Sequence, residues 1–145
     1  MHKPKVLFLC TGNSARSQMG EAALRHYAGD RFDVYSAGLY AKGINPYTVR
    51  VLIEQGYDLT PHYSKDVGEY LGKVHFAYVI TVCGHADKNC PVAWLTGPEK
   101  VHWPFEDPAE FEGDDAATLA KFRETRDLIE ARVRAWLDKQ GIAVA

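Results

Sequence analysis

A cysteine and an arginine six residues apart are the first candidates for chemistry in this 145-residue chain. Cys10 follows a short apolar run, and Arg16 and Ser17 precede a segment that can form a helix. A loop of this length can curl so that its backbone N–H groups point inward at the helix N-terminus, where Arg16 adds bidentate hydrogen bonds. The pattern therefore predicts a cradle for a tetrahedral oxyanion. Its residues are Thr11, Gly12, Asn13, Ser14, Ala15 and Arg16.

The same loop makes Cys10 a candidate nucleophile. The positive field that binds an anion also stabilises a thiolate, and the Ser17 hydroxyl can donate a hydrogen bond to the sulfur. The alternative is a small buried cysteine that ends a core strand, but the neighbouring Gly12, Arg16 and Ser17 favour a catalytic loop. The segment is not a Walker loop, because it lacks the Gly-Lys-Ser/Thr ending of nucleotide-binding sites.

Two further cysteines, Cys83 and Cys90, follow the most strongly apolar run of the chain. If the segment between them were helical, the two would lie about 10.5 Å apart, beyond the ~7 Å limit for a disulfide, so pairing requires the segment to unwind. Gly84 and Pro91 at its ends suit a marginal element. Buried structural thiols are an alternative, and zinc binding with His85 is disfavoured because a second ligand pair is missing.

Asp107 is a further candidate for the site. It precedes Pro108 and follows the last predicted strand, so it can approach the other candidates at one edge of a sheet. The alternative is an aspartate that only forms a turn before proline.

The elements that must position these residues alternate between strands and helices. Apolar or alternating runs predict strands over residues 6–9, 32–36, 76–82 and 101–103. Helical periodicity predicts helices over residues 17–28, 47–55 and 115–140, with a short helix near 66–71. This order predicts a single α/β domain over residues 1–145, with a four-stranded parallel sheet and helices on both faces. Ligands bind at the carboxyl ends of such strands, where Cys10, Cys83 and Asp107 would converge.

Composition narrows the class of protein and its partners. The chain has 17 Lys and Arg against 19 Asp and Glu, a net charge of −2, so no nucleic-acid partner is expected. No apolar run approaches the ~20 residues of a membrane span, and residues 1–10 do not form a signal peptide. We therefore expect a cytoplasmic protein, in which reduced cysteines serve catalytic, redox or metal-binding roles. We also expect it to be a monomer.

Together these motifs resemble the low-molecular-weight protein tyrosine phosphatase superfamily, and within it the thioredoxin-coupled arsenate reductases. The resemblance covers nearly the whole chain and implies a flavodoxin-like winding of the sheet. The first motif is shared by phosphatases and reductases, whereas the pair Cys83 and Cys90 separates the reductases. The resemblance rests on residues 10–17, 36–38, 81–83, 89–91 and 102–108.

The resemblance implies a relay of three cysteines. Cys10 attacks arsenate, held by Arg16, and Asp107 protonates the departing oxygen. Cys83 then attacks Cys10 and releases arsenite, and Cys90 attacks Cys83. Thioredoxin reduces the resulting disulfide by thiol exchange, so no further cofactor is required. Phosphate and sulfate are expected to compete with arsenate for the loop.

The chain departs from the phosphatases of this superfamily in one position, and two alternative functions bear on the assignment. Phosphatases of the superfamily usually carry Tyr or Trp just after their Asp-Pro pair, where this chain has Ala109, so a small inorganic oxyanion is favoured. The alternative enzyme is a phosphotyrosine phosphatase that uses Cys10, Arg16 and Asp107. A module that only binds oxyanions is disfavoured, because passive binding does not need a nucleophilic thiol.

Some reductases of the superfamily also bind potassium beside the anion loop. All four matching positions can offer oxygen atoms, which suits a hard cation. An equally good alternative is a hydrogen-bonded scaffold that orients the loop. The matching positions are Asn13, Glu21, Ser36 and Asp66.

Overall fold

The computed structural model describes residues 3–90 and 97–143, so Pro91 lies outside the described residues. Within them, no helix is both long enough and apolar enough to span a membrane. In chain order the elements are β1 (Lys5–Cys10), α1 (Arg16–Ala28), β2 (Asp33–Gly38), α2 (Pro46–Glu54), the 3-10 helix η1 (Val67–Glu69), β3 (Tyr78–Thr81), α3 (Gly84–Lys88), β4 (Glu99–His102), the 3-10 helix η3 (Pro108–Glu110) and α4 (Asp115–Lys139).

The strands form one parallel sheet in the order β2-β1-β3-β4, which confirms the predicted sheet. β1 is central, and its Val6 is in register with Val34 on β2 and Tyr78 on β3. β1 is buried along almost all of its length, as its continuous apolar run predicts. β4 is an edge strand, mostly exposed, and it begins two residues earlier than the predicted 101–103 because its polar residues give no apolar signal.

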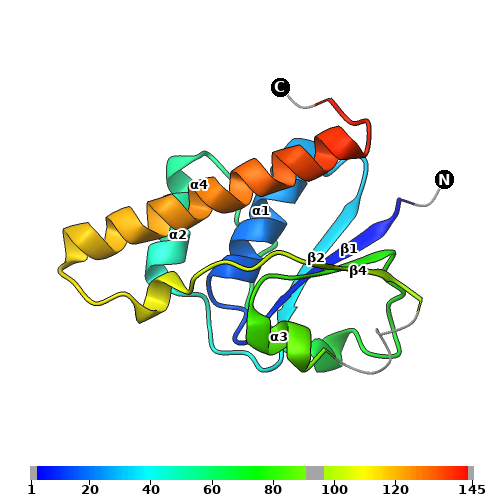
Figure 1. Ribbon diagram of the computed structural model, residues 1–145, viewed down its shortest axis with the longest axis horizontal. Coiled ribbons are helices and arrows are strands. Elements are labelled where there is room, and N and C mark those ends of the chain that lie inside the picture. The colour runs from blue at the N-terminus through cyan, green and yellow to red at the C-terminus, as the bar shows by residue number, and fades with distance from the viewer. Residues whose placement is uncertain (1–2, 91–96, 144–145) are drawn as a thin grey trace.

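Helices α1 and α4 pack against each other and cover one face of the sheet (Figure 1). The contact on this face is largely aromatic: the ring of Trp103 lies 6.0 Å from Phe8 and 6.4 Å from Trp136, measured between centroids. Trp136 belongs to the apolar stripe of α4, whose first turn is capped by Asp114 accepting a hydrogen bond from the Ala117 backbone N–H. The long C-terminal helix therefore fixes the sheet from one side.

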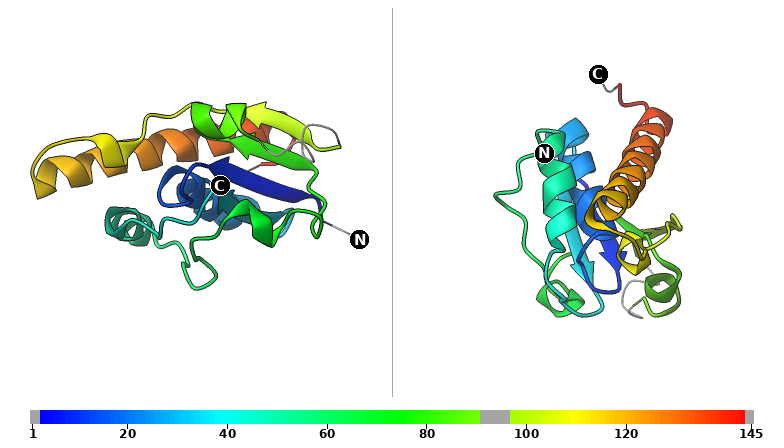
Figure 2. Two further views of the ribbon diagram at one scale, coloured as in Figure 1. Left: turned by 90° about the horizontal axis from the view of Figure 1, so that it is seen from below. Right: turned by 90° about the vertical axis from the view of Figure 1, so that its left-hand side faces the viewer.

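The opposite face is covered more thinly, by α3 and by the segment that contains η1 (Figure 2). There Tyr35 of β2 packs edge-on against Tyr70 and Phe76, with ring centroids 5.2 and 5.4 Å away. Helix α2 contacts α4 and α1 beside the sheet. Helices thus lie on both faces, as predicted, and the carboxyl ends of β1 and β3 open toward the same edge of the molecule.

Candidate active site

The loop between β1 and α1, residues 11–15, is held in place by the segment that follows β2. The carbonyls of Thr11 and Gly12 accept hydrogen bonds from the backbone N–H groups of Tyr40 and Lys42, at 3.1 and 2.9 Å. Asn13 adopts φ 48°, a left-handed conformation that asparagine tolerates better than most residues. The loop can therefore keep its tight curl over the N-terminus of α1.

Gly38, at the end of β2, permits this close approach. A Cβ atom at this position would lie 2.6 Å from the Asn13 nitrogen and 2.7 Å from the Thr11 carbonyl oxygen. No side chain fits within such distances of rigid backbone. The Ser36-Ala37-Gly38 motif thus has a steric role: it lets the second strand touch the loop.

The Cys10 sulfur receives two hydrogen bonds inside the loop. Its Sγ lies 2.8 Å from Ser17 Oγ and accepts from the Asn13 backbone N–H at 3.3 Å. The Asn13 side-chain Nδ2 donates to Ser17 Oγ at 2.8 Å, so the serine hydroxyl hydrogen is free to point at the sulfur. Both groups therefore direct a donor at the sulfur and fix its position inside the loop.

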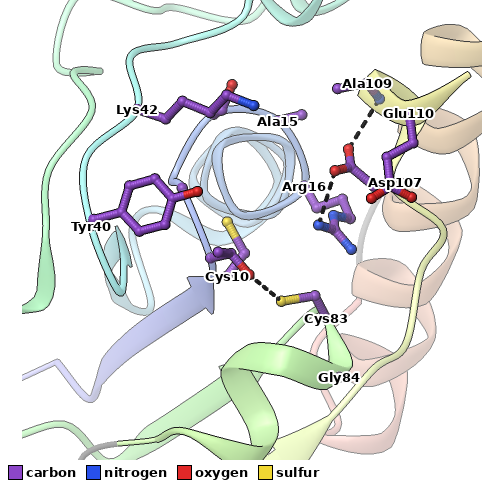
Figure 3. A pocket seen from close by; sticks show the side chains of 13 residues that line it. Cys10, Ala15, Arg16, Tyr40, Lys42, Cys83, Gly84, Asp107, Ala109 and Glu110 are labelled. Carbon is purple, nitrogen blue, oxygen red and sulfur yellow. Dashed lines mark hydrogen bonds and ion pairs between the residues drawn. The ribbon is translucent and has the colours of Figure 1, made fainter.

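Arg16 and Asp107 face each other across the mouth of this loop (Figure 3). Arg16 Nη1 donates to the Phe105 carbonyl at 3.0 Å, and its Nη2 lies 3.5 Å from Asp107 Oδ2. The other carboxylate oxygen of Asp107 accepts from the Ala109 backbone N–H at 3.0 Å and so caps η3. A cavity of about 440 Å³ opens between the loop, Arg16 and Asp107.

Cys83 lines the same cavity as Cys10 (Figure 3). Its sulfur lies 3.3 Å from Thr11 Oγ1 and accepts a hydrogen bond from the Ala86 backbone N–H at 3.3 Å. β3 and β1 are neighbouring parallel strands, so their carboxyl ends bring residues 83 and 10 to one edge. The structure thus unites Cys10, Arg16, Cys83 and Asp107 around one space.

Cys90 is kept apart from that space by α3. It is buried, and it is not among the residues that line the cavity. Burial raises the pKa of the Cys90 thiol above its ordinary value. The segment expected to unwind is helical over Gly84–Lys88, and its unwinding stays a prediction.

Three of the four residues expected to bind potassium are joined to one another by hydrogen bonds. Ser36 Oγ donates to Glu21 Oε1 at 2.5 Å and accepts from Asn13 Nδ2 at 3.0 Å. Asp66 does not join them, because its carboxylate is exposed and caps η1 through the Gly68 N–H at 2.7 Å. The ammonium of Lys65 lies among the three instead, and sequence analysis gave it no role.

Sequence analysis also missed Gln18 and His62. Gln18 Nε2 donates to Asn13 Oδ1 at 2.9 Å, and its Oε1 lies 2.7 Å from His62 Nδ1. Burial lowers the pKa of His62. Only the Cys10 motif could have pointed to Gln18, which follows Ser17 directly. In the described residues, leaving aside the side chain of His85, no group of three or more His, Cys, Asp or Glu side chains could hold a metal ion.

The comparisons with known proteins cover almost the whole chain. Residues 5–143 match the family described as low molecular weight phosphotyrosine protein phosphatase. An arsenate reductase of Halalkalibacterium halodurans is 45% identical over 139 residues, which is 95% of this chain and 98% of that protein. A solved arsenate reductase in its phosphate-binding state is 29% identical, with a TM-score of 0.77 over 94% of this chain and 98% of that one. A thioredoxin-dependent arsenate reductase of Corynebacterium glutamicum is 30% identical, with a TM-score of 0.72 over 94% of this chain and 61% of its own.

Proposed function

Because the chain belongs to the low molecular weight phosphotyrosine protein phosphatase family, we propose that it turns the family's cysteine loop to the reduction of arsenate to arsenite. One observation carries the proposal: a second thiol, Cys83, lines the cavity of the nucleophile Cys10. Hydrolysis needs one cysteine, because water resolves the covalent intermediate. Reduction must deliver two electrons to arsenic. Two thiols supply them when they are oxidised to one disulfide, so a second thiol is needed within the site.

In the first step the Cys10 thiolate attacks the arsenic atom of a bound arsenate. A sulfur–arsenic bond forms, and an oxygen leaves. Asp107, in its protonated form, gives that oxygen a proton so that it departs as water. Arg16 lies opposite Asp107 and neutralises the oxyanion through its guanidinium.

In the second step the Cys83 thiolate attacks the Cys10 sulfur. The sulfur–sulfur bond forms while the sulfur–arsenic bond breaks, and its electron pair stays on arsenic. Arsenic falls from the +5 to the +3 state and leaves as arsenite, while the two thiols become one disulfide. The location of Cys83 at the rim of the loop, 3.3 Å from Thr11 Oγ1, supports this step.

In the third step Cys90 attacks Cys83, which returns Cys10 as a thiolate and leaves a Cys83–Cys90 disulfide. This exchange requires α3 to open, since the helix separates the two residues. A dithiol protein of the thioredoxin type then takes over the disulfide and regenerates the enzyme. The thioredoxin-dependent relative from Corynebacterium glutamicum supports this choice of reductant. A relay that cycles through free thiols would work in a reducing compartment such as the cytoplasm.

Arsenate and phosphate have almost the same shape and charge, so the loop alone cannot distinguish them. Selectivity must arise from the chemistry, because thiols reduce arsenic(V) and not phosphorus(V). Phosphate is therefore expected to compete for the loop. The hydrolase alternative is not favoured, because Ala109 stands where phosphatases of the family carry an aromatic residue that stacks on an aryl ring.

The test is arsenite formation from arsenate in the presence of thioredoxin, thioredoxin reductase and NADPH. Cys83→Ser and Cys90→Ser should lose arsenate turnover yet keep the cleavage of an aryl phosphate, which needs only the first thiol. Cys10→Ser should lose both activities and serves as the matched control. Equal arsenate turnover in the wild type, Cys83→Ser and Cys90→Ser, or aryl phosphate cleavage without arsenite, would reject the relay.

A further inference from the structure

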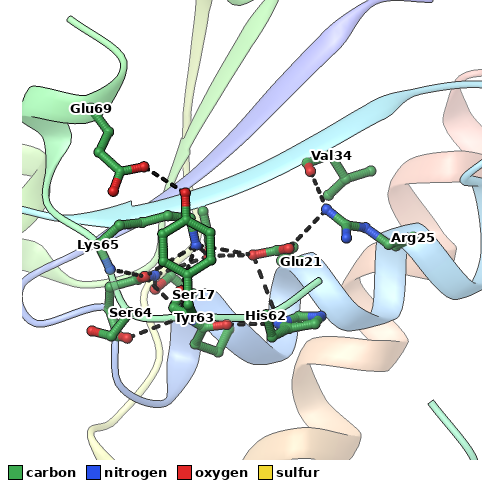
Figure 4. A network of polar contacts seen from close by, with 12 residues as sticks. Ser17, Glu21, Arg25, Val34, His62, Tyr63, Ser64, Lys65 and Glu69 are labelled. Carbon is green, nitrogen blue, oxygen red and sulfur yellow. Dashed lines mark hydrogen bonds and ion pairs between the residues drawn. The ribbon is translucent and has the colours of Figure 1, made fainter. Parts of the chain in front are cut away.

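The ammonium of Lys65 is surrounded by oxygen atoms beneath the Cys10 loop (Figure 4). Its Nζ donates to the Tyr63 carbonyl at 2.8 Å and lies 3.4 Å from Ser36 Oγ. Asn13 Oδ1 and Glu21 Oε1 follow at 3.5 and 3.7 Å. The lysine is only 4% exposed, so four oxygens inside the protein take the place of its water shell.

The oxygen atoms around the Lys65 ammonium cannot bind a potassium ion at the same time. Three of the four oxygen donors expected for the ion, those of Asn13, Glu21 and Ser36, face the ammonium. The fourth, Asp66, points to solvent and caps η1. A second positive charge among the same oxygens would repel the ammonium, so the two cations exclude each other.

We propose that Lys65 is a built-in cation that takes the place of a bound metal ion and positions the catalytic loop through Asn13. The backbone N–H of Lys65 donates to Asn13 Oδ1 at 3.0 Å, and the ammonium approaches the same oxygen. With its oxygen held toward Lys65, the Asn13 amide directs Nδ2 at Ser17. Ser17 is the group that donates to the Cys10 sulfur, so Lys65 acts on the nucleophile through two intermediate side chains.

The charges around Glu21 support a cationic role for this lysine. Glu21 is 2% exposed, and its second oxygen pairs with Arg25 Nη2 at 2.8 Å. Oε1, the oxygen nearest Lys65, accepts a hydrogen bond from Ser36. Removing the ammonium would leave this oxygen and the Tyr63 carbonyl without their cationic partner, in a cage of oxygens that suits a hard cation. A cavity of about 400 Å³ borders this cage, and Glu21, Tyr63 and Lys65 are among the residues that line it.

The decisive variant is Lys65→Ser, which removes the ammonium and leaves its space empty. Without potassium, we expect kcat/KM for arsenate to fall about 10- to 100-fold, as for a displaced catalytic group. Potassium, but not tetramethylammonium at equal ionic strength, should restore most of the loss. Lys65→Met is the matched control: it removes the charge but fills the space, so its loss should persist in potassium. Lys73→Ser, on the exposed surface, should match the wild type.

The inference rests on the proposed function, but two readouts test it without arsenate chemistry. The rate at which iodoacetamide alkylates Cys10 at fixed pH should fall in Lys65→Ser and recover with potassium. The Tm of Lys65→Ser should rise with potassium, while the Tm of the wild type should not respond. If these two readouts behave as expected and no arsenite forms, the proposed function fails and the inference stands.

Two results would overturn the inference itself. The first is a wild-type protein whose Tm and Cys10 alkylation rate respond to potassium as strongly as those of Lys65→Ser, since the ion would then bind despite the lysine. The second is a Lys65→Ser protein that keeps full activity and alkylation rate in the absence of potassium. The wild-type titration needs no variant, so the inference stays testable even if Lys65→Ser does not fold.

Discussion

At the scale of single residues, the hydrogen bond between Ser17 and Cys10 is the most direct contact with the proposed nucleophile. Ser17→Ala removes a donor at 2.8 Å from the sulfur that attacks. A hydrogen bond to a charged group contributes about 1.5–3 kcal/mol, so we expect kcat/KM for an aryl phosphate to fall about 10- to 150-fold. Steady-state kinetics of Ser17→Ala and the wild type measure the loss. An unchanged kcat/KM would show that the serine does not act on the nucleophile.

Asp107 caps η3 and is the proposed acid, and a single substitution can separate these two roles. Asn keeps a side-chain oxygen that can cap η3 by accepting from the Ala109 N–H, but it cannot protonate a leaving oxygen. We expect Asp107→Asn to lose about 10²- to 10⁴-fold in kcat for arsenate, with an unchanged Tm. Glu106→Gln, at the exposed neighbouring carboxylate, is the control and should keep the wild-type rate. Undiminished turnover in Asp107→Asn would remove Asp107 from the reaction.

Some residues of the site could be predicted from the sequence and others could not. Cys10, Arg16 and Ser17 could be predicted because all three belong to one short segment, so residues that act together are also close together in the sequence. Lys65 could not, because a buried lysine and an exposed one look the same in a sequence, and the partners of Lys65 lie on α1 and β2. Asp66 was expected at the cation site, but its side chain lies at the surface. Lys65, its neighbour in the chain, points inward instead, because adjacent side chains point in different directions.

At the scale of elements, α3 lies between Cys83 and Cys90, and the proposed relay requires this helix to open. Gly84 begins this five-residue helix, and a Cβ there meets no other atom within 4 Å. Gly84→Ala should therefore stabilise the helix by about 0.4–1 kcal/mol and slow the Cys90 attack up to about fivefold. The measurement is the lifetime of the Cys10–Cys83 disulfide in a single turnover without thioredoxin. Aryl phosphate cleavage, which needs no unwinding, is the internal control, and an unchanged lifetime would show that α3 opens without hindrance.

The pKa of Cys90 gives this element a pH signature. Burial raises the pKa, so the thiol is mostly protonated at neutral pH. Because the thiolate is the nucleophile, formation of the Cys83–Cys90 disulfide should accelerate about tenfold per pH unit above pH 7, up to the raised pKa. Rapid-quench trapping of the disulfides in a single turnover measures this rate. A flat profile would mean that the opening of α3, and not the ionisation of Cys90, limits the rate.

The elements differ in how clearly the sequence predicts them, and burial explains the difference. β1 is a continuous apolar run because both of its faces are covered. β4 lies at the edge with most of its residues exposed, so its start was misplaced by two residues. The helix expected near residues 66–71 is only a 3-10 turn over Val67–Glu69, capped by Asp66, and Gly72 with φ 74° follows it closely. Pattern reading thus succeeds where an element packs on the core.

At the scale of the whole molecule, a cluster of ion pairs joins α2 to α4. Both carboxylate oxygens of Glu54 are bonded: Oε1 accepts from Arg126 Nη1 at 2.9 Å, and Arg123 binds Oε2. Arg126 Nη1 also donates to the Val51 carbonyl at 2.8 Å. Since α2 follows the segment that supports the Cys10 loop, these contacts connect the long C-terminal helix with the layer around the site.

The cluster predicts how the stability of the fold responds to acid. The hydrogen bond from Arg123, with the one from Arg126, lowers the pKa of Glu54 to about 2, although partial burial opposes the shift. In the unfolded chain the pKa of a glutamate carboxyl is about 4.3. A carboxyl whose pKa is lower in the folded state stabilises the fold above the unfolded pKa, and this contribution is lost as the pH falls toward about 2.

Glu54→Gln should therefore have a lower Tm than the wild type at pH 7, and the difference should shrink between about pH 4 and pH 2. Thermal unfolding followed by circular dichroism across this range measures it. Other carboxyls titrate there too, but they titrate in both proteins, so the difference isolates Glu54. Glu112→Gln, at an exposed position before α4, provides the reference for removing one negative charge from the surface. A difference that stays constant down to pH 2 would mean that Glu54 stabilises α2 through packing, since a neutral glutamic acid would then serve as well as the anion.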